Sequence, residues 1–533
     1  MRAHQGTGKL IRLILRRDRW LLPVWVVLLA GYTVSLTSSI DKLYPTGAER
    51  LTFIAETAGT GSYMAMFGPA FGSGTGALGA QRATSVLVIV AVINLLTAVR
   101  HTRTEEEAGR RELLAATPIG RQAPVSAVLA VLFCADLVLG LLVALGMTSL
   151  DSSVAGAFAL GLEVTLAGWI MAAVGVFLAQ VCAGARIARG IGFAALAGVY
   201  LLRMAGDAGG DDGGASWLWV LSPIAWLQRV RAYADERWWL FLPALALVLV
   251  LTAGAYALSA RRDIGAGLLQ PRLGPAEGSA YLGGPLGLAW RLHRGLLIAW
   301  SFGFAVAGAV FGGLAQSADT TVGDNQRLQD ILDRMGGQGA FSDSFLAAMT
   351  SLIGVIAAGY AVQTVFMLRS EEAGQRAEPV LSLGVSRLRW AAGHLTFTIL
   401  GTSAALLSYG LFAGLTYGTG RGDLGGELPR VLGAALVQLP AVWTVAAVTL
   451  LCYGLLPRLT AVAWAAPVLC LVFGQFGAIF KLDQWVLDIS PFTHVPRLPG
   501  GHVSATSLVV LLAIALILGA AGLIGFRRRD IPI

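Results

Sequence analysis

Charged residues are scarce in this chain: Lys, Arg, Asp and Glu make up 13% of its 533 residues, whereas 56% of the residues are hydrophobic. Cysteine is scarcer still, and none of the four cysteines belongs to a CxxC pair or lies outside an apolar run. This pattern disfavours a disulfide framework or a cysteine metal site. We expect buried thiols that behave as small apolar groups at Cys134, Cys182, Cys452 and Cys470.

A phosphate-binding loop is also absent. The nearest approach is GTGKL at residues 6–10, which lacks the first glycine of GxxxxGK[ST] and has Leu10 where a hydroxyl would bind magnesium. We therefore expect no catalytic residue, metal or cofactor in this chain, and any ATP would be hydrolysed by another polypeptide. The net charge of +8 does not indicate a nucleic-acid partner, because the basic residues cluster beside apolar runs as topology signals do.

Long apolar runs dominate the sequence. A helix of about 20 apolar residues crosses a bilayer core, and these runs are too long and too continuously apolar for barrel strands. The predicted fold class is an all-α polytopic membrane protein with about twelve transmembrane helices. The expected spans are 20–39, 83–100, 124–148, 154–183, 190–205, 238–260, 294–315, 345–369, 389–416, 430–456, 459–480 and 504–526.

Basic residues alternate between the ends of these spans and predict which side is cytoplasmic. The predicted cytoplasmic segments, which include both termini, carry Arg16, Arg17, Arg19, Arg103, Arg110, Arg111, Arg121, Arg186, Arg189, Arg261, Arg262, Arg527, Arg528 and Arg529. The opposite loops are acidic or mixed and carry Asp151, Asp207, Asp211, Asp212, Asp319, Asp324, Asp330 and Asp333.

The sequence repeats itself in its second half. RTEEEAGRRELLAATPIGR at 103–121 returns as RSEEAGQRAEPVLSLGVSRLRW at 369–390, with Glu106 and Glu107 matched to Glu371 and Glu372 and a one-residue insertion after Gly374. WLWVLSPIAWLQR at 217–229 and RRDIGAG at 261–267 also return, at 485–497 and 528–533. We expect two fused six-helix halves, 1–266 and 267–533, with a linker near 265–287. Because six is even, a pseudo-two-fold axis along the membrane normal would relate them, with a substrate pathway between the halves.

Both charged repeats follow the second span of their half. Thr104 and Glu107 have the spacing of a capping box, and the i,i+4 pairs Glu106–Arg110 and Glu107–Arg111 favour a short surface helix. In the second copy Ser370 is the expected cap and Glu372–Arg376 the pair, and Pro379 is expected to end the helix early. The alternative is a solvated turn that only enforces topology.

The acidic run, followed by Gly-Arg, Glu-Leu-Leu and Thr-Pro, resembles the membrane subunits of type-2 ABC exporters, in particular the fused twelve-span polyketide-antibiotic (tetronasin-type) subgroup. The resemblance implies a bacterial plasma-membrane permease that docks on two copies of an ATP-binding cassette subunit, identical or different, which hold ATP and Mg. It places the coupling helices on Glu105, Glu106, Glu107, Gly109, Arg110, Arg111, Glu112 and Leu113, and on Glu371, Glu372, Gly374, Arg376 and Glu378.

The N-terminal segment has the pattern of a helix lying on the membrane surface. Its basic residues recur at three- and four-residue spacing on one face, with Ile11, Ile14 and Leu15 on another. Exporters similar to this chain have such an elbow helix beside the coupling helix. The expected basic face is Lys9, Arg12, Arg16 and Arg19.

Two acidic residues lie inside predicted spans, where charge is costly and often functional. Asp136 and Glu163 lie at similar depth and are expected to meet or to face one polar cavity, with Thr402 and Gln438 at roughly corresponding places in the second half. They would attract a cationic substrate or ion. The alternative is a protonated or hydrogen-bonded pair that fixes helix packing.

These observations favour an ATP-driven efflux permease for amphiphilic small molecules such as polyketide antibiotics, a cargo implied by the resemblance alone. A first rival is a proton-coupled secondary transporter that uses Asp136 and Glu163, although EEEAGRRELL is unlike the GxxxDRxGRR loop of major-facilitator proteins. A second rival is a membrane enzyme, for which the outer loops supply acidic residues without an evident nucleophile.

Overall fold

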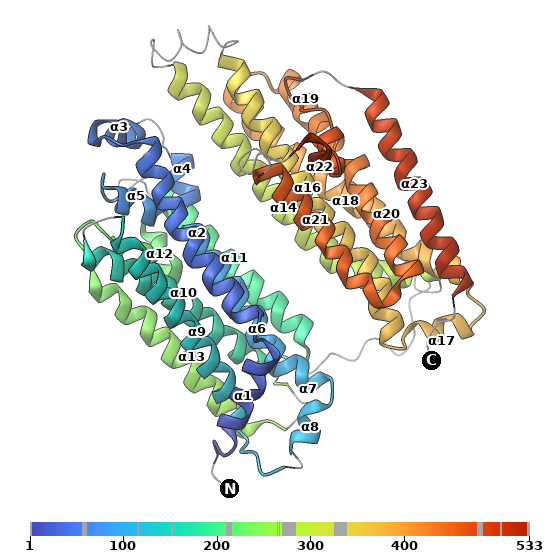
Figure 1. Cartoon of the computed structure of the whole chain (residues 1–533), viewed down its shortest axis with the longest axis horizontal. Coiled ribbons are helices and arrows are strands. Elements are labelled where there is room, and N and C mark those ends of the chain that lie inside the picture. The colour runs from blue at the N-terminus through green and yellow to red at the C-terminus, as the bar shows by residue number, and fades with distance from the viewer. Residues whose placement is uncertain are drawn as a thin grey trace. The chain divides into compact units, whose positions relative to one another are not determined.

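The computed structural model describes residues 3–55, 61–115, 117–150, 153–208, 216–263, 265, 267–268, 284–323, 338–476, 483–501 and 504–529. These described residues contain helices and connecting segments and no β-sheet. The chain divides into two compact units, Met1–Gly274 and Pro275–Ile533 (Figure 1).

The first unit is built around one central helix. Its elements are α1 (Thr7–Arg17), α2 (Leu21–Leu43), α3 (Gly47–Phe53), α4 (Gly61–Phe67), α5 (Thr75–Arg82), α6 (Thr84–Val99), η2 (Arg100–Thr104), α7 (Glu105–Glu107), α8 (Arg110–Ala115), α9 (Ala123–Thr148), α10 (Val154–Val181), α11 (Ala185–Ala208), η3 (Ser216–Leu221), α12 (Pro223–Gln228), η4 (Trp238–Leu240) and α13 (Phe241–Arg261). Helix α10 packs against α6, α9 and α13. Gly140 and Gly161 let α9 and α10 approach so closely that a Cβ on either would lie 2.4 Å from the other's carbonyl oxygen.

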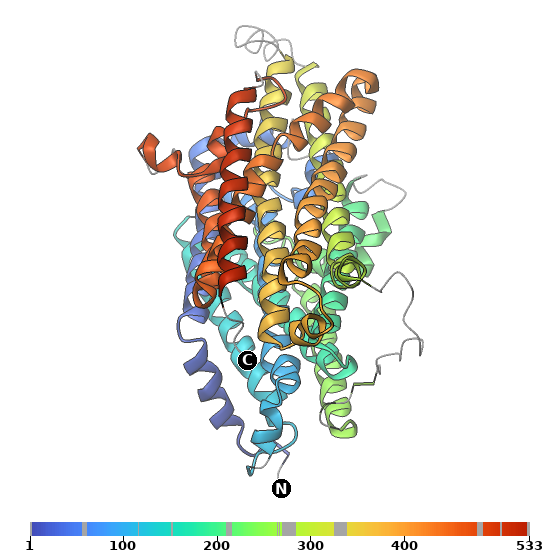
Figure 2. The same ribbon diagram turned by 90° about the vertical axis from the view of Figure 1, so that its right-hand side faces the viewer.

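The second unit has longer helices that run side by side (Figure 2). Its elements are α14 (Pro285–Gly323), α16 (Gln338–Ala373), α17 (Ala377–Ser382), α18 (Arg387–Arg421), α19 (Leu424–Leu436), α20 (Leu439–Leu455), η6 (Pro457–Trp464), α21 (Ala465–Phe476), α22 (Gln484–Leu487), η7 (Pro491–His494) and α23 (Ala505–Arg528). Glycines again mark the close contacts: Gly308 and Gly312 of α14 face α18, and Gly454 of α20 faces Gly522 of α23.

Eleven helices in the described residues are long and apolar enough to cross a membrane. The run expected at 459–480 contains a shorter apolar helix, Val462–Leu471, and residues 477–482 lie outside the described part. The all-helical, multi-pass fold is thus confirmed, whereas the twelfth span and the two-repeat arrangement stay predictions. For Asp319, expected in an outer loop, only the backbone is described. The other acidic residues expected in outer loops that lie outside the described residues are Asp151, Asp211, Asp212, Asp324, Asp330 and Asp333.

The cysteines are all free, but they differ in burial. Cys182 and Cys470 are buried and Cys452 is partly buried, as the sequence predicts. Cys134, in contrast, is exposed on α9. Its apolar surroundings in the sequence did not distinguish a helix face turned toward the unit's interior from one turned outward, so the expectation of burial is wrong there.

Candidate functional site

The first charged loop continues directly from α6. The π-helical turn η2 and the short helix α7 extend α6 to Glu107, and α8 begins at Arg110 after Gly109 adopts a left-handed conformation with φ of 69°. Thr104 is itself helical, with φ of −66° and ψ of −35°, and its side chain caps no helix. The predicted capping box is therefore wrong, because the helical backbone continues through Thr104 from η2 into α7.

The predicted ion pairs are shifted by one residue. Arg110 pairs with Glu105 at 2.9 Å and Arg111 pairs with Glu106 at 3.0 Å, so both pairs are i,i+5. The i,i+4 pairs expected for one continuous helix do not form among these residues, because the turn at Gly109 separates the acidic α7 from the basic start of α8.

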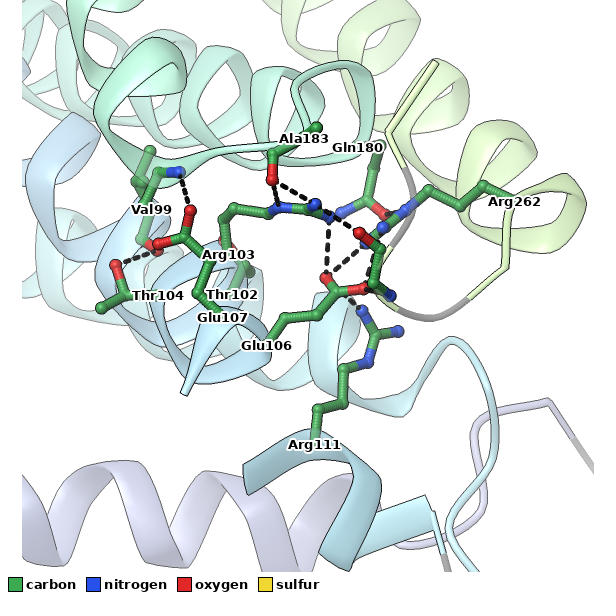
Figure 3. A network of polar contacts seen from close by, with 12 residues as sticks. Val99, Thr102, Arg103, Thr104, Glu106, Glu107, Arg111, Gln180, Ala183 and Arg262 are labelled. Atoms are coloured by element: carbon green, nitrogen blue, oxygen red, sulfur yellow. Dashed lines mark hydrogen bonds and ion pairs between the residues drawn. The ribbon is translucent and has the colours of Figure 1, made fainter. Parts of the chain in front are cut away.

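Glu106 is the centre of a buried ionic network (Figure 3). Its side chain is 2% exposed, and Arg262 at the end of α13 donates from Nη1 to Oε1 at 2.9 Å and from Nη2 to Oε2 at 2.7 Å. Arg111 contacts the same carboxylate, Arg103 lies 3.4 Å from Oε2, and the Gly265 amide donates at 2.7 Å. The prediction that Glu106 is exposed is therefore wrong. Three guanidinium partners stabilise its carboxylate in a buried position.

The network ties the loop to several parts of the first unit. Arg103 donates to the Ala183 carbonyl at 3.0 Å, and Arg262 Nε donates to Gln180 Oε1 at 2.8 Å. Both acceptors lie at the end of α10 or just after it. Glu107 Oε1 accepts from the Ala185 amide at 2.8 Å and so caps the first turn of α11. A force on the loop would therefore reach α10, α11 and α13.

Some residues of the loop do face solvent. Of the residues assigned to docking, Glu107, Arg110 and Glu112 are exposed, as is Ala108. Glu105 and Gly109 are half-buried, Arg111 has only 14% of its side chain exposed, and the side chain of Leu113 is outside the described part. Burial lowers the pKa of the Arg111 guanidinium, and the Glu106 carboxylate opposes that shift.

Helix α1 has the predicted basic face. The basic residues predicted for this face are exposed, although one of them, Arg19, lies beyond the end of α1 at Arg17. The apolar face differs from the prediction, because Leu10 and Ile14 are buried against the unit whereas Leu15 is exposed. Arg17 pairs with Glu105 at 2.5 Å, so α1 is joined to the loop. The exposed basic positions are Lys9, Arg12, Arg16 and Arg19.

The second charged loop is built differently. Glu372 is buried and accepts from the Tyr453 hydroxyl and from Arg529 Nη2, both at 2.6 Å. Arg376 pairs with Glu371 at 3.0 Å instead of with Glu372. Ser370 lies inside α16 and so does not cap a helix.

The proline of the second loop does not end its helix. Pro379 lies in the first turn of α17, where no intrahelical N–H bond is required, and the helix runs on to Ser382. The predicted early break is therefore wrong. Gly374, Arg376 and Glu378 are exposed, whereas Glu371 is buried.

The contacts of the two loops correspond without an insertion. The left-handed turns fall at Gly109 and Gln375, the i,i+5 pairs at Glu105–Arg110 and Glu371–Arg376, and the buried carboxylates at Glu106 and Glu372. Arg121 and Arg387 both donate to the backbone carbonyl of the arginine that pairs with this carboxylate. The predicted match of Glu106 to Glu371 is thus one residue out of register.

Asp136 and Glu163 have different surroundings. Both are buried; Asp136 Oδ1 accepts from Asn94 Nδ2 at 2.8 Å, and its carboxyl group lies against Gly168. Glu163 lines a cavity of about 20 Å³ with Gln81, Gln228 and Arg231, among others. The described contacts do not join the two acids, so they form neither the predicted pair nor one shared cavity.

The polar residues expected at similar depth in the second unit are packed. Thr402 accepts from Trp443 Nε1 at 3.0 Å and donates to the Thr398 carbonyl at 2.8 Å. Gln438 is buried so close to Gly354 that a Cβ there would lie 2.7 Å from its Oε1.

Sequence reasoning missed several residues that hold the loops. The sequence marks Arg262 and Arg529 as basic residues and as parts of repeats, but it does not mark them as partners of buried carboxylates. Gln180 and Tyr453 had not been singled out. The repeated RRD sequence at 261–263 and 528–530 is the signal that links the two arginines to comparable roles.

Comparison with known proteins agrees with a transport role. Residues 282–527 match the family described as "Multidrug efflux system permease Rv1217c, C-terminal domain". The multidrug efflux system permease protein Rv1217c of Mycobacterium tuberculosis (strain ATCC 25618 / H37Rv) is 41% identical over 527 residues, which cover 99% of this chain and 95% of that protein. With eleven long apolar helices in its described residues and a relative of this similarity over nearly its full length, the chain belongs to the family of multidrug efflux system permeases.

Proposed function

We propose that this permease is the transmembrane subunit of an ATP-driven ABC exporter. Its cargo would be amphiphilic small molecules of the antibiotic class, including polyketides, and ATP with Mg would bind to two separate cassette subunits. The observation that carries the proposal is the anchoring of an exposed charged loop, through buried Glu106, to the ends of α10 and α13. A rigidly anchored loop transmits a push, whereas a solvated turn would absorb it.

The path of that push follows from the packing of the first unit. Arg103 and Arg262 bind groups at the cytoplasmic end of α10 in the proposed topology, and α10 packs against α6, α9 and α13. Closure of the cassette subunits on ATP would move the loop, and the loop would bias the helices toward an outward-open state.

The partner-facing surface is then the exposed part of each loop. In the first loop Ala108, Arg110 and Glu112 are exposed, while Glu106 is unavailable to a partner. The second loop exposes the counterparts Gly374, Arg376 and Glu378. Both loops and both termini lie in the cytoplasm in this proposal.

The test is co-purification with a candidate cassette subunit. We expect the R110A/E112A double variant to lose the subunit. The matched control R261A/D263A also removes one exposed positive and one exposed negative charge, and it should retain the subunit. Both variants should purify as folded monodisperse protein. Retention of the subunit by R110A/E112A, or absence of any cassette subunit from wild type, would overturn docking through this loop.

A proton-coupled transporter is the second candidate, and one observation favours it. Asp136 Oδ2 and Glu163 Oε1 are buried and have no hydrogen-bond partner among the described residues. Buried carboxylates of this kind can carry protons across a membrane. Transport by vesicles in which the proton gradient is collapsed and ATP is present separates the two candidates: continued transport supports the ATP-driven exporter, and its loss supports proton coupling.

A further inference from the structure

A groove lies between α1 and the start of α9, beside the first charged loop. Its volume is about 80 Å³, several times the space that a single water molecule needs. One wall consists of Leu10, Leu13 and Ile14 of α1, and the facing wall includes Val125 and Val128 of α9. The groove is therefore suited to a hydrocarbon chain along most of its length.

The end of the groove near the charged loop is polar. Arg17 and Glu105 line it there, together with His101. These groups are already paired: Arg17 with Glu105, and His101 with buried Asp18 at 2.6 Å. The polar end is closed by an internal ion pair and a hydrogen bond, and it offers no free charge to an apolar chain.

Unpaired positive charge lies along the outer edge of the groove. Lys9 and Arg16 are four residues before and three residues after Leu13, so both adjoin this rim residue on the helix surface. Both are exposed, and no ion pair to either is found among the described residues. Leu13 itself is 53% exposed, so the apolar wall is open on the side that carries these cations.

We propose that this groove binds one acyl chain of an anionic phospholipid, with the lipid phosphate held by Lys9 and Arg16. An apolar groove beside free cations fits an acyl chain joined to a negatively charged headgroup. Zwitterionic lipids would lack the net attraction to the two cations. The site does not depend on the proposed energy source, and it places a lipid chain between α1 and α9, beside the charged loop.

In the part of the second unit that the structure describes, from residue 284 onward, no equivalent break separates a surface helix from the first span. Helix α14 is continuous from Pro285 to Gly323, and His293 on it is buried and hydrogen-bonded to His394 of α18 at 2.9 Å. In the first unit, α1 ends at Arg17 and α2 begins at Leu21, which separates α1 as its own helix. The lipid site is therefore a property of the first unit.

The test uses a photoactivatable phosphatidylglycerol and a matched phosphatidylcholine in nanodiscs that contain the full chain. We expect the glycerol probe to crosslink to residues 9–17 and 124–128 about 25-fold more than the choline probe, at about fivefold for each of the two cations. Leu13→Trp, which fills the groove, should abolish this crosslink. Leu15→Trp should leave it unchanged, because Leu15 is exposed on α1 and does not line the groove.

A charge-matched pair of variants separates the site from general surface attraction. K9Q/R16Q should reduce the preference for phosphatidylglycerol by more than tenfold, at about fivefold for each charge removed. R12Q/R19Q removes the same charge from positions that do not adjoin Leu13 and should reduce it much less. Equal crosslinking of the two probes, an unchanged crosslink in Leu13→Trp, or equal effects of the two charge variants would overturn the proposal. None of these outcomes depends on binding of a cassette subunit.

Discussion

The two charged loops bury a carboxylate at corresponding positions but compensate for it differently. Glu106 has three arginine partners and the Gly265 amide, whereas Glu372 has one arginine and the Tyr453 hydroxyl. Glu372 Oε1 has no hydrogen-bond partner among the described residues. Since a buried charge is stable only when its partners replace its hydration, the first loop should be the more firmly anchored.

The largest effect should come from removing Glu106. Glu106→Ala leaves Arg103, Arg111 and Arg262 close together without their shared carboxylate, and we expect the free energy of unfolding to fall by about 3–5 kcal/mol. Denaturant titration in detergent micelles measures the loss. Arg261→Ala, at an exposed neighbour of Arg262, should change it by less than about 0.5 kcal/mol. A Glu106 variant as stable as this control would remove the basis of the comparison.

Removing Glu372 should cost less. Glu372→Ala deprives Tyr453 and Arg529 of one acceptor, and we expect a loss of about 1–3 kcal/mol in the same measurement. Arg529 would keep its contacts over the Tyr453 and Phe526 rings, 4.8 and 5.3 Å from their centroids. If Glu372→Ala destabilises the protein as much as Glu106→Ala, the two anchors are equivalent despite their different partners.

Arg111 is the arginine that the second loop replaces, because Ala377 stands at the corresponding place. Arg111→Ala should make the first loop more like the second in how firmly it is anchored. We expect the free energy of unfolding to fall by about 1–2 kcal/mol, since Arg262 still holds Glu106. Arg110→Ala is the control: its pair with Glu105 is exposed and is worth less than about 1 kcal/mol. Equal losses in the two variants would show that burial does not set the strength of these pairs.

The smallest effects should come from the left-handed turns. A Cβ at Gly109 would meet no atom within 4 Å. Gly109→Ala should therefore destabilise the loop by about 1 kcal/mol only because alanine disfavours the left-handed backbone conformation. Gln375 has φ of 55°, and Gln375→Gly should stabilise the second loop by about 0.5 kcal/mol. Hydrogen exchange of α8 and α17 amides measures both. If the two variants changed amide protection in the same direction, the turns at Gly109 and Gln375 would not share one backbone geometry.

The spans were the predictable part of the fold, because each depends on a local run of apolar residues. The eleven spans found in the described residues coincide with expected runs, and the expected short run 190–205 proves longer, Ala185–Asp207. The run at 459–480 shows the limit: hydropathy alone did not reveal that a 3₁₀ segment, Pro457–Trp464, would occupy its start.

The loop details were less predictable because they depend on where a helix begins. The same Thr-x-x-Glu spacing occurs at Thr46–Glu49 and at Thr104–Glu107. Thr46 is extended, with ψ of 151°, and forms a full capping box in which hydrogen bonds from its backbone and side chain lower the pKa of Glu49. Thr104 is in mid-helix and caps nothing. Spacing identifies a candidate cap, but the end of the preceding helix decides whether it is used.

The burial of Glu106 could not be predicted from its neighbours. An acidic run beside arginines is typical of a solvated surface, and only the arrival of Arg262 from 156 residues away makes the site an interior one. For the same reason Asp136 and Glu163, which the depth argument brought together, have partners on different elements.

The distance along the chain between Glu106 and its partners has a consequence for biosynthesis. Beyond its local partners Arg103 and Arg111, the carboxylate can reach Arg262 and the Gly265 amide only after 156 and 159 further residues have been made, which takes roughly 10–30 s at ordinary rates of translation. Glu372 can contact Arg529 only after 157 further residues have been made. Each loop therefore remains unlocked while its own half is being synthesised, and a chain truncated before residue 262 would keep its first loop exposed to quality control.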